Sequence, residues 1–244
     1  MKQYRWLILL GAVTFVIGVV TLFPARVAYS LFAPDGIRLS GITGTLWNGS
    51  VAEAEVSGLY IGDLSWSFQP GGLFRGELGY AVEASPAGGI ATANIGVGFG
   101  EVNLRNLEGG LSIAAIQSVV STPGIEGSTR FDFPLVRLEN GFPTAADGTV
   151  EIRGLVARGL SQAPLGDFRA VLASSDASIS GSIEDLAGVL DIAGSLRIGA
   201  NRTYLLTGLV APTPETPEGI VNQLRFLGSP NERGQRQFRF EGRL

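Results

Sequence analysis

The chain contains no cysteine and no histidine. Without cysteine there is no disulfide framework, so the fold does not depend on an oxidising compartment. Without either residue, the usual structural zinc sites and the nitrogen and sulfur ligands of transition metals are excluded. The lack of histidine also removes the side chain that most often acts as a general base near neutral pH. These absences argue against an enzyme.

Charge is scarce, and its balance is acidic. Charged residues make up 16% of the 244 residues, against roughly 25% in typical soluble domains. Apart from Lys2, Arg5 and Arg26, 15 cationic residues stand against 22 acidic ones, a net charge of −7. A negative chain without a basic patch does not suit nucleic acid as a partner. The sparse charge instead favours exposed apolar surface of the kind that meets a partner or a lipid.

A long apolar run stands at the N-terminus. The stretch from Trp6 to Phe23 carries no charge and would span about 27 Å as a helix, close to the ~30 Å hydrocarbon core of a bilayer. Tyr4 and Trp6 lie where aromatic residues meet the membrane interface, and two cations precede the run. The sequence therefore predicts a bacterial inner-membrane protein with a cytoplasmic N-terminus over residues 1–5, a transmembrane anchor over 6–23 and a periplasmic β-rich domain over 24–244.

Two alternatives to the anchor stay open. A cleaved signal peptide has a shorter apolar core, of about 7–15 residues, and the best cleavage pattern here is the poor match Ala28-Tyr29-Ser30. A buried core helix is the other alternative, although basic flanks at a chain terminus are not typical of one.

Beyond the run, apolar and polar residues alternate with a period of two and are punctuated by glycine, as in half-buried strands joined by tight turns. Turn sequences recur about every ten residues, which favours an antiparallel meander over βαβ units. The 35 glycines permit bulges and strong curvature. We predict a mainly β fold, a single transmembrane helix followed by a curved antiparallel meander sheet with one or two short helices. The alternating segments contain Ile95, Val97 and Phe99; Val150 and Ile152; Phe168, Ala170 and Leu172; Leu190, Ile192, Leu196 and Ile198; Tyr204, Leu206 and Val210; and Phe238 and Phe240.

Two segments break this rhythm with helical spacing. Leu111–Val120 is expected to form one short helix, and the second opens with Thr216 as N-cap, Pro217 at the first helical position and a first-turn acid, and ends before Gly228. The Pro- and Thr-rich residues 209–217 are expected to be a loop. Turns are predicted at Asp35-Gly36, Asn140-Gly141, Asp147-Gly148 and Gly199-Ala200-Asn201.

Catalytic signatures are missing from the sequence. The only lysine is Lys2, so a serine–lysine pair is excluded outside the anchor. Gly96–Gly100 has the wrong spacing for a dinucleotide loop and is typical of a curved glycine-rich strand. Glu184-Asp185 is expected in a solvated turn, and Glu53 and Glu55 on one strand face, so neither pair stands out as the acids of a glycosidase. We predict no enzymatic activity, no cofactor and no metal site.

Aromatic residues are the more distinctive feature. Trp47, Trp66 and Phe74 lie in glycine-rich strand and turn sequences, where they form either a core face or a surface for a ligand or partner. The residues predicted to contact a partner or lipid are Trp47, Trp66, Phe74, Ile95, Val97, Phe99, Leu190 and Ile192, and those at the membrane interface are Tyr4 and Trp6.

Several of these segments resemble the general secretion pathway protein N family of bacterial type II secretion systems. The likeness rests on a G-T-L-W-x-G element at residues 44–49, a W-x-x-x-P element at 66–70 with a Leu-Phe-x-Gly turn at 73–76, and a closing Leu-Gly at 227–228 with glycine- and phenylalanine-bearing residues 234–244. The resemblance covers essentially the whole chain. It implies a single-pass inner-membrane subunit that associates with secretion-platform proteins, and a distant kinship to AsmA-like proteins, whose curved sheets form lipid grooves.

Three functions remain open at this point. The first is an accessory subunit of type II secretion that acts through protein contacts. The second is binding or transfer of phospholipid or another hydrophobic ligand by a groove in the curved sheet. The third, a glycan hydrolase with two carboxylates, has no marked acid pair to support it.

Overall fold

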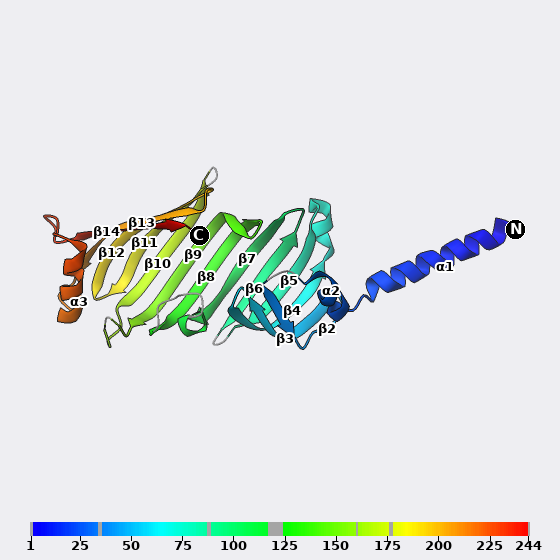
Figure 1. The fold of residues 1–244 in the computed structure, drawn as a ribbon, viewed down its shortest axis with the longest axis horizontal. Helices are drawn as coiled ribbons and strands as arrows, with labels where there is room; N and C mark the ends of the chain where they lie inside the picture. Colours follow the sequence, from blue (N-terminus) through cyan, green and yellow to red (C-terminus); the bar gives the residue numbers. More distant parts are fainter. Residues whose placement is uncertain are drawn as a thin grey trace.

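The computed structural model describes residues 2–33, 36–86, 89–116, 124–159, 161–175 and 178–243. Its fourteen strands form one sheet in which each strand hydrogen-bonds antiparallel to the next along the chain, except that β1 and β2 both pair with β3. The predicted antiparallel meander is confirmed. Figure 1 shows the strands side by side along the long axis, with α1 projecting from the end that holds β1–β5 and α3 at the opposite end.

The strands differ widely in length. They are β1 (Ile37–Ser40), β2 (Thr43–Gly44), β3 (Asn48–Val56), β4 (Leu59–Gln69), β5 (Leu78–Ser85), β6 (Ile90–Val97), β7 (Glu101–Ser112), β8 (Ile125–Glu139), β9 (Phe142–Ala157), β10 (Gly166–Ser175), β11 (Ser178–Gly188), β12 (Leu190–Gly199), β13 (Thr203–Pro212) and β14 (Arg236–Arg243). The helices are α1 (Lys2–Thr21), α2 (Ala25–Phe32) and α3 (Glu218–Leu224), and the 3-10 turns are η1 (Pro70–Arg75), η2 (Ile113–Ile116) and η3 (Arg225–Leu227).

One face of the sheet is apolar along most of its length. Residues directly opposite each other on antiparallel strands point to the same face, so rows of register partners trace it across the strands. Two such rows are Phe68, Tyr80, Ile95, Leu104 and Val136 on β4 to β8, and Leu172, Gly181, Leu196, Leu206 and Phe240 on β10 to β14. The opposite face is largely polar, as in the row Ser182, Ser195, Thr207 and Arg239.

The sheet is a single layer over most of its length. Most domains bury a sheet face under a second layer, but among the described residues no large side chain is fully buried. The main core cluster lies at the C-terminal end, where Ile220 and Leu224 of α3 pack on Leu165, Leu190 and Val210 of the sheet region. Elsewhere, most side chains of the apolar face are half-buried, although Val51, Ala54, Ala84, Ala146 and Ile179 are buried.

The predicted second helix is confirmed as α3 followed by η3, which ends at Leu227, directly before Gly228. Its start is shifted by one position, because Pro217 occupies the N-cap and makes no side-chain cap. Thr216 instead donates its hydroxyl hydrogen bond to the Val189 carbonyl. The predicted loop over 209–217 is shorter than expected, since its first four residues belong to β13 and Pro212 lies opposite Leu190.

Three further local predictions are wrong. Leu111 and Ser112 belong to β7, and only the 3-10 turn η2 follows them, while residues 117–120 of the predicted helix lie outside the described residues. Asp147-Gly148 lies inside β9, where a Cβ at Gly148 would lie 2.3 Å from the Asp132 carbonyl oxygen and 2.5 Å from Cδ1 of Phe133. Glu184-Asp185 lies inside β11, where the Asp185 carboxylate accepts the Ile192 amide at 2.7 Å.

The remaining turn predictions have mixed outcomes. Asn140-Gly141 and Gly199-Ala200-Asn201 connect consecutive strands as expected. Asp35 lies outside the described residues. Phe99 is not a strand residue, because β6 ends at Val97 and Gly98–Gly100 turns the chain into β7.

Helix α1 stands apart from the sheet (Figure 1). Its large apolar side chains are exposed on all sides, with Trp6 at 76% and Phe15 at 71%. Within the described part of the chain, no helix meets the combined requirement of length and apolar character for a membrane crossing. The transmembrane anchor stays a prediction.

Candidate functional site: the apolar sheet face and the Glu77 network

The two predicted tryptophans connect the N-terminal segment to the sheet. Trp47 donates its indole N–H to the Val20 carbonyl at 2.6 Å, and its ring meets Phe68 edge-on at 4.8 Å between centroids. Trp66 lies on the apolar face and donates its indole N–H to the Leu46 carbonyl at 3.1 Å. Both indole N–H groups are therefore satisfied by backbone, and Trp47 ties the end of α1 to β4.

The other predicted contact residues fall into two groups. Ile95 is half-buried on the apolar face, whereas Val97 is 41% exposed at its rim. Phe74 in η1 and Phe99 in the β6–β7 turn are almost fully exposed. By contrast, Leu190 and Ile192 lie under α3 in or against the core cluster.

The predicted interfacial pair belongs to α1. Trp6 is exposed on its surface, and Tyr4 lies in the first turn of the helix, where the side chain is outside the described part. The eight predicted contact residues therefore do not meet in one place. The structure brings together the N-terminal subset at one end of the sheet and covers the C-terminal pair with a helix.

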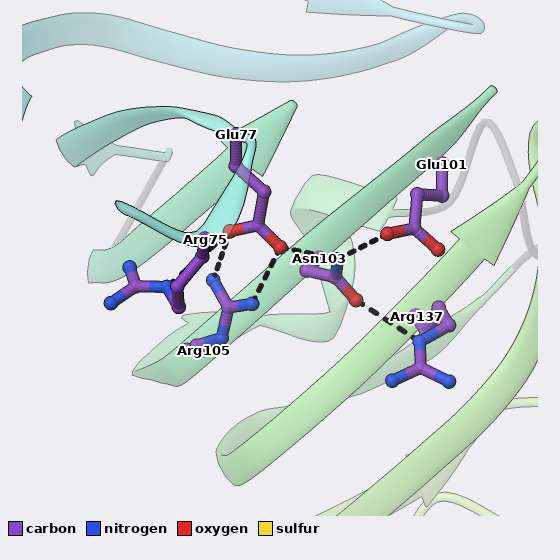
Figure 2. Close-up of polar contacts among 6 residues, drawn as sticks. All are labelled: Arg75, Glu77, Glu101, Asn103, Arg105 and Arg137. Atoms are coloured by element: carbon purple, nitrogen blue, oxygen red, sulfur yellow. Dashed lines mark hydrogen bonds and ion pairs between the residues drawn. The ribbon is translucent and has the colours of Figure 1, made fainter. Parts of the chain in front are cut away.

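The polar face carries a buried network that sequence reasoning missed (Figure 2). Glu77 and Asn103 are the buried polar residues of the described chain, at 7% and 2% exposure. Arg105 donates two hydrogen bonds to the Glu77 carboxylate, at 2.7 Å to Oε1 and 2.8 Å to Oε2. Asn103 donates to the same carboxylate at 2.9 Å and accepts from Nε of Arg137 at 3.1 Å. The network joins the start of β5 to β7 and β8.

The arrangement stabilises the charged form of Glu77. The Arg105 hydrogen bonds lower the pKa of Glu77 below its ordinary value of 4.5, against the opposing effect of burial, and Asn103 and Arg75 add to the lowering. The same pairing raises the pKa of Arg105. A carboxylate held ionised by a bidentate guanidinium is a poor proton donor or acceptor near neutral pH, so its chemistry suits structure rather than acid–base work.

Two glycines shape the network, one through its backbone conformation and the other through its lack of a side chain. Gly76, with φ of +73°, ends η1 in the left-handed conformation and sends the chain to Glu77. A Cβ at Gly96 would lie 2.3 Å from Oε2 of Glu77 and 3.0 Å from Nη1 of Arg105. The glycine-rich sequence around Gly96 therefore serves close packing of an ion pair, which the alternation pattern alone did not reveal.

Gly96→Ala is expected to destabilise the full chain by about 1–3 kcal/mol, because the added methyl displaces the Glu77 carboxylate from Arg105. Urea unfolding in detergent micelles followed by tryptophan fluorescence measures this. Gly71→Ala in η1 is the matched control: its added Cβ meets nothing within 4 Å, and a change within about 0.5 kcal/mol is expected. If the two substitutions change the free energy of unfolding equally, displacing the Glu77 carboxylate does not weaken the network.

Several other acids on the polar face have arginine or serine partners. Glu151 accepts from Arg169 at 2.9 Å and from Arg153 at 3.2 Å, and the Arg169 hydrogen bonds are the main cause of its lowered pKa. Glu53 and Glu55 share one face of β3, as predicted, opposite Ser40 and Arg38. Among the described side chains, no three acidic groups converge as metal ligands.

These features define a class of protein: a one-layer β-sheet scaffold with open faces and exposed loop edges. Comparison with known proteins gives the family. A profile described as type II secretion system (T2SS), protein N matches residues 35–239. No solved structure matches the chain. The chain belongs to the type II secretion system protein N family, and the resemblance seen in the sequence is confirmed.

Named relatives support the same assignment. The type II secretion system protein N of Vibrio cholerae serotype O1 is 26% identical over 248 residues, covering 97% of each chain. The protein of the same name from Aeromonas hydrophila is 24% identical over 217 residues, or 86% of each chain. A short Aeromonas salmonicida sequence of that name is 44% identical over 45 residues, 18% of this chain.

Proposed function

We propose that the chain is a non-enzymatic accessory subunit of the type II secretion system, anchored in the bacterial inner membrane by its N-terminal helix. The family match over residues 35–239 carries this proposal. Residues 24–244 form the periplasmic part, which contacts secretion-platform proteins of the inner membrane. The anchor leaves residues 1–5 in the cytoplasm.

Contacts at the base of α1 support an uncleaved anchor over a signal peptide. The Phe23 carbonyl accepts the Leu46 amide at 2.9 Å, in addition to the Trp47 bond to Val20. Tyr29, within the best cleavage sequence, donates its hydroxyl to the Ile37 carbonyl and accepts the Leu39 amide. Cleavage would remove or free groups that the folded domain uses.

A complementation experiment tests the proposal. In a strain deleted for this gene, export of a type II substrate is expected to fall at least tenfold and to recover with the full chain. A variant in which residues 2–23 are replaced by a cleavable signal peptide is expected to restore less than a third of that export, since it reaches the periplasm without an anchor. Normal export in the deletion strain would end the subunit proposal, and full rescue by the variant would end the anchor.

The half-buried apolar face favours a second candidate, the holding of an acyl chain or another hydrophobic ligand along the sheet. The face runs from β4 to β14, and α3 covers only its C-terminal end. Ile95 and Asn94 form a matched pair for testing it, because neighbouring residues of β6 point to opposite faces. A photo-crosslinking residue at Ile95 is expected to capture phospholipid in cells if this candidate holds. Capture of phospholipid in equal amounts from Asn94, or of proteins alone from Ile95, would remove it.

A further inference from the structure

Two neighbouring loops at one edge of the sheet expose apolar side chains that nothing in the described chain covers. Phe74 in η1 is 95% exposed and Phe99 in the β6–β7 turn is 105% exposed. The register pair Leu78–Val97 brings these loops together, because β5 begins and β6 ends at this edge. We call Leu73, Phe74, Leu78, Val97 and Phe99 the edge patch; all five side chains are exposed.

The edge patch lies at the end of the sheet from which α1 emerges. Trp47 binds the Val20 carbonyl of α1 and packs on Phe68, and Phe68 stands next to the last residue of β4. Residue 70 then begins η1 directly. The end of the helix and the loop that carries Phe74 are thus joined through two packed aromatic rings. A bilayer that holds α1 would pass close to this loop.

A cation accompanies the patch. Arg75 is exposed, and its Nε makes a long ion pair with the Glu77 carboxylate, at 3.7 Å. Arg75 and Arg105 line a small hollow of about 230 Å³ beside η1, together with Tyr80. Aromatic side chains at the headgroup level with a guanidinium beside them match the chemistry of a phospholipid interface, where the guanidinium meets phosphate.

We propose that the edge patch rests on the phospholipid bilayer that holds α1, so that the domain is fixed to the membrane at two points. This inference rests on the proposed anchoring of α1. Phe74 and Phe99 enter the interface, Arg75 faces the headgroup phosphates, and the two contacts set the tilt of the sheet over the membrane. The rim residues Leu78 and Val97 then bring the apolar face to the lipid surface.

Site-specific labelling of the full chain tests this, and the lack of native cysteine makes single labels clean. The variants are Phe74→Cys, Phe99→Cys, Val13→Cys in α1, and Ala200→Cys in the exposed β12–β13 turn far along the same edge. Each carries an environment-sensitive fluorophore in vesicles of phosphatidylethanolamine and phosphatidylglycerol. Brominated phospholipids are expected to quench labels at 13, 74 and 99 at least threefold more than the label at 200.

The labels separate failure of the anchor from failure of the inference. If the label at residue 13 is quenched but those at residues 74 and 99 are not, the proposed bilayer contact of the edge patch is wrong and the proposed anchor stands. No quenching at 13 overturns the anchor, whatever the loops do. Shielding of 74 and 99 from aqueous iodide without quenching by brominated lipid would mean a protein covers the patch, which also overturns the inference. Arg75→Gln is expected to lower the quenching at 74 when phosphatidylglycerol is present.

Discussion

Ile220→Ala is expected to destabilise the C-terminal third of the sheet by about 2–3 kcal/mol and to leave the N-terminal strands unchanged. Ile220 is 4% exposed and packs with Leu224 on Leu165, Leu190 and Val210. Removing its branched side chain costs the burial of several methyl groups and leaves a cavity under α3. The expected loss of stability is at the lower end for such substitutions, because a short surface helix can move toward the sheet and fill part of the cavity.

The effect is local because each strand contacts mainly its sequence neighbours. A scaffold of that kind resembles a repeat array, in which stability is a sum of neighbouring interactions and unfolding can be confined to one end. Hydrogen exchange should therefore quicken in β12 to β14 and not in β3 to β6.

Hydrogen exchange read by mass spectrometry on the full chain in micelles measures this difference. Gln223→Ala, an exposed change in the same helix, serves as the control and should alter protection by less than about 0.5 kcal/mol. If Ile220→Ala loosens β3 to β6 as much as β12 to β14, the sheet unfolds as one cooperative unit and the local description is wrong.

The alternation of apolar and polar residues was sufficient to predict the sheet and one of its faces. Leu190, Ile192, Leu196 and Ile198 do point to one side of β12, and the other predicted period-two segments lie in strands except at Phe99. The pattern predicts the sheet well because each strand of a meander pairs with the next strand along the chain. The register is also fixed, since a one-residue slip would turn the apolar side chains to the polar face.

Two kinds of feature were not predictable from the sequence. An Asp-Gly pair can occur in a turn or inside a strand, and the sequence around Asp147-Gly148 does not distinguish the two. In the structure, the Asp147 carboxylate accepts the Ser174 amide, and the glycine makes room for Phe133. Short apolar runs such as Leu111–Val120 do not distinguish a helix from a strand, because a few residues fit either period.

The Glu77 network was missed for a different reason. Glu77 immediately precedes β5, whereas Asn103 and Arg105 lie on β7, and only the registers of β5 with β6 and of β6 with β7 bring them together. The alternation of Asn103 with Arg105 does place both on one face of β7. Nothing local to either segment indicates that a glutamate at the start of β5 fills the space above Gly96.

Arg105→Met is expected to destabilise the full chain by about 2–3 kcal/mol at pH 7. The substitution keeps most of the aliphatic volume but leaves the Glu77 carboxylate, at 7% exposure, without its two charge-assisted hydrogen bonds. When a buried charge loses its partner, the free-energy cost of its desolvation is no longer offset by an ion pair. The expected value is below that for a fully isolated pair, because Asn103 still donates and Arg75 stays near.

The pH dependence distinguishes loss of this ion pair from loss of packing. Because Arg105 lowers the pKa of Glu77 below 4.5, the stabilisation is fully present above about pH 4.5 and is lost as the pH falls through the folded-state pKa. Urea unfolding should therefore show a difference in unfolding free energy between the native chain and Arg105→Met that narrows as the pH falls below about 4.5. Arg158→Met breaks the exposed pair with Glu126 and is expected to change stability little, since water screens that pair. If the difference in unfolding free energy stays constant down to pH 3, Arg105 stabilises the fold through its aliphatic contacts. The charge of Glu77 would then contribute nothing to stability.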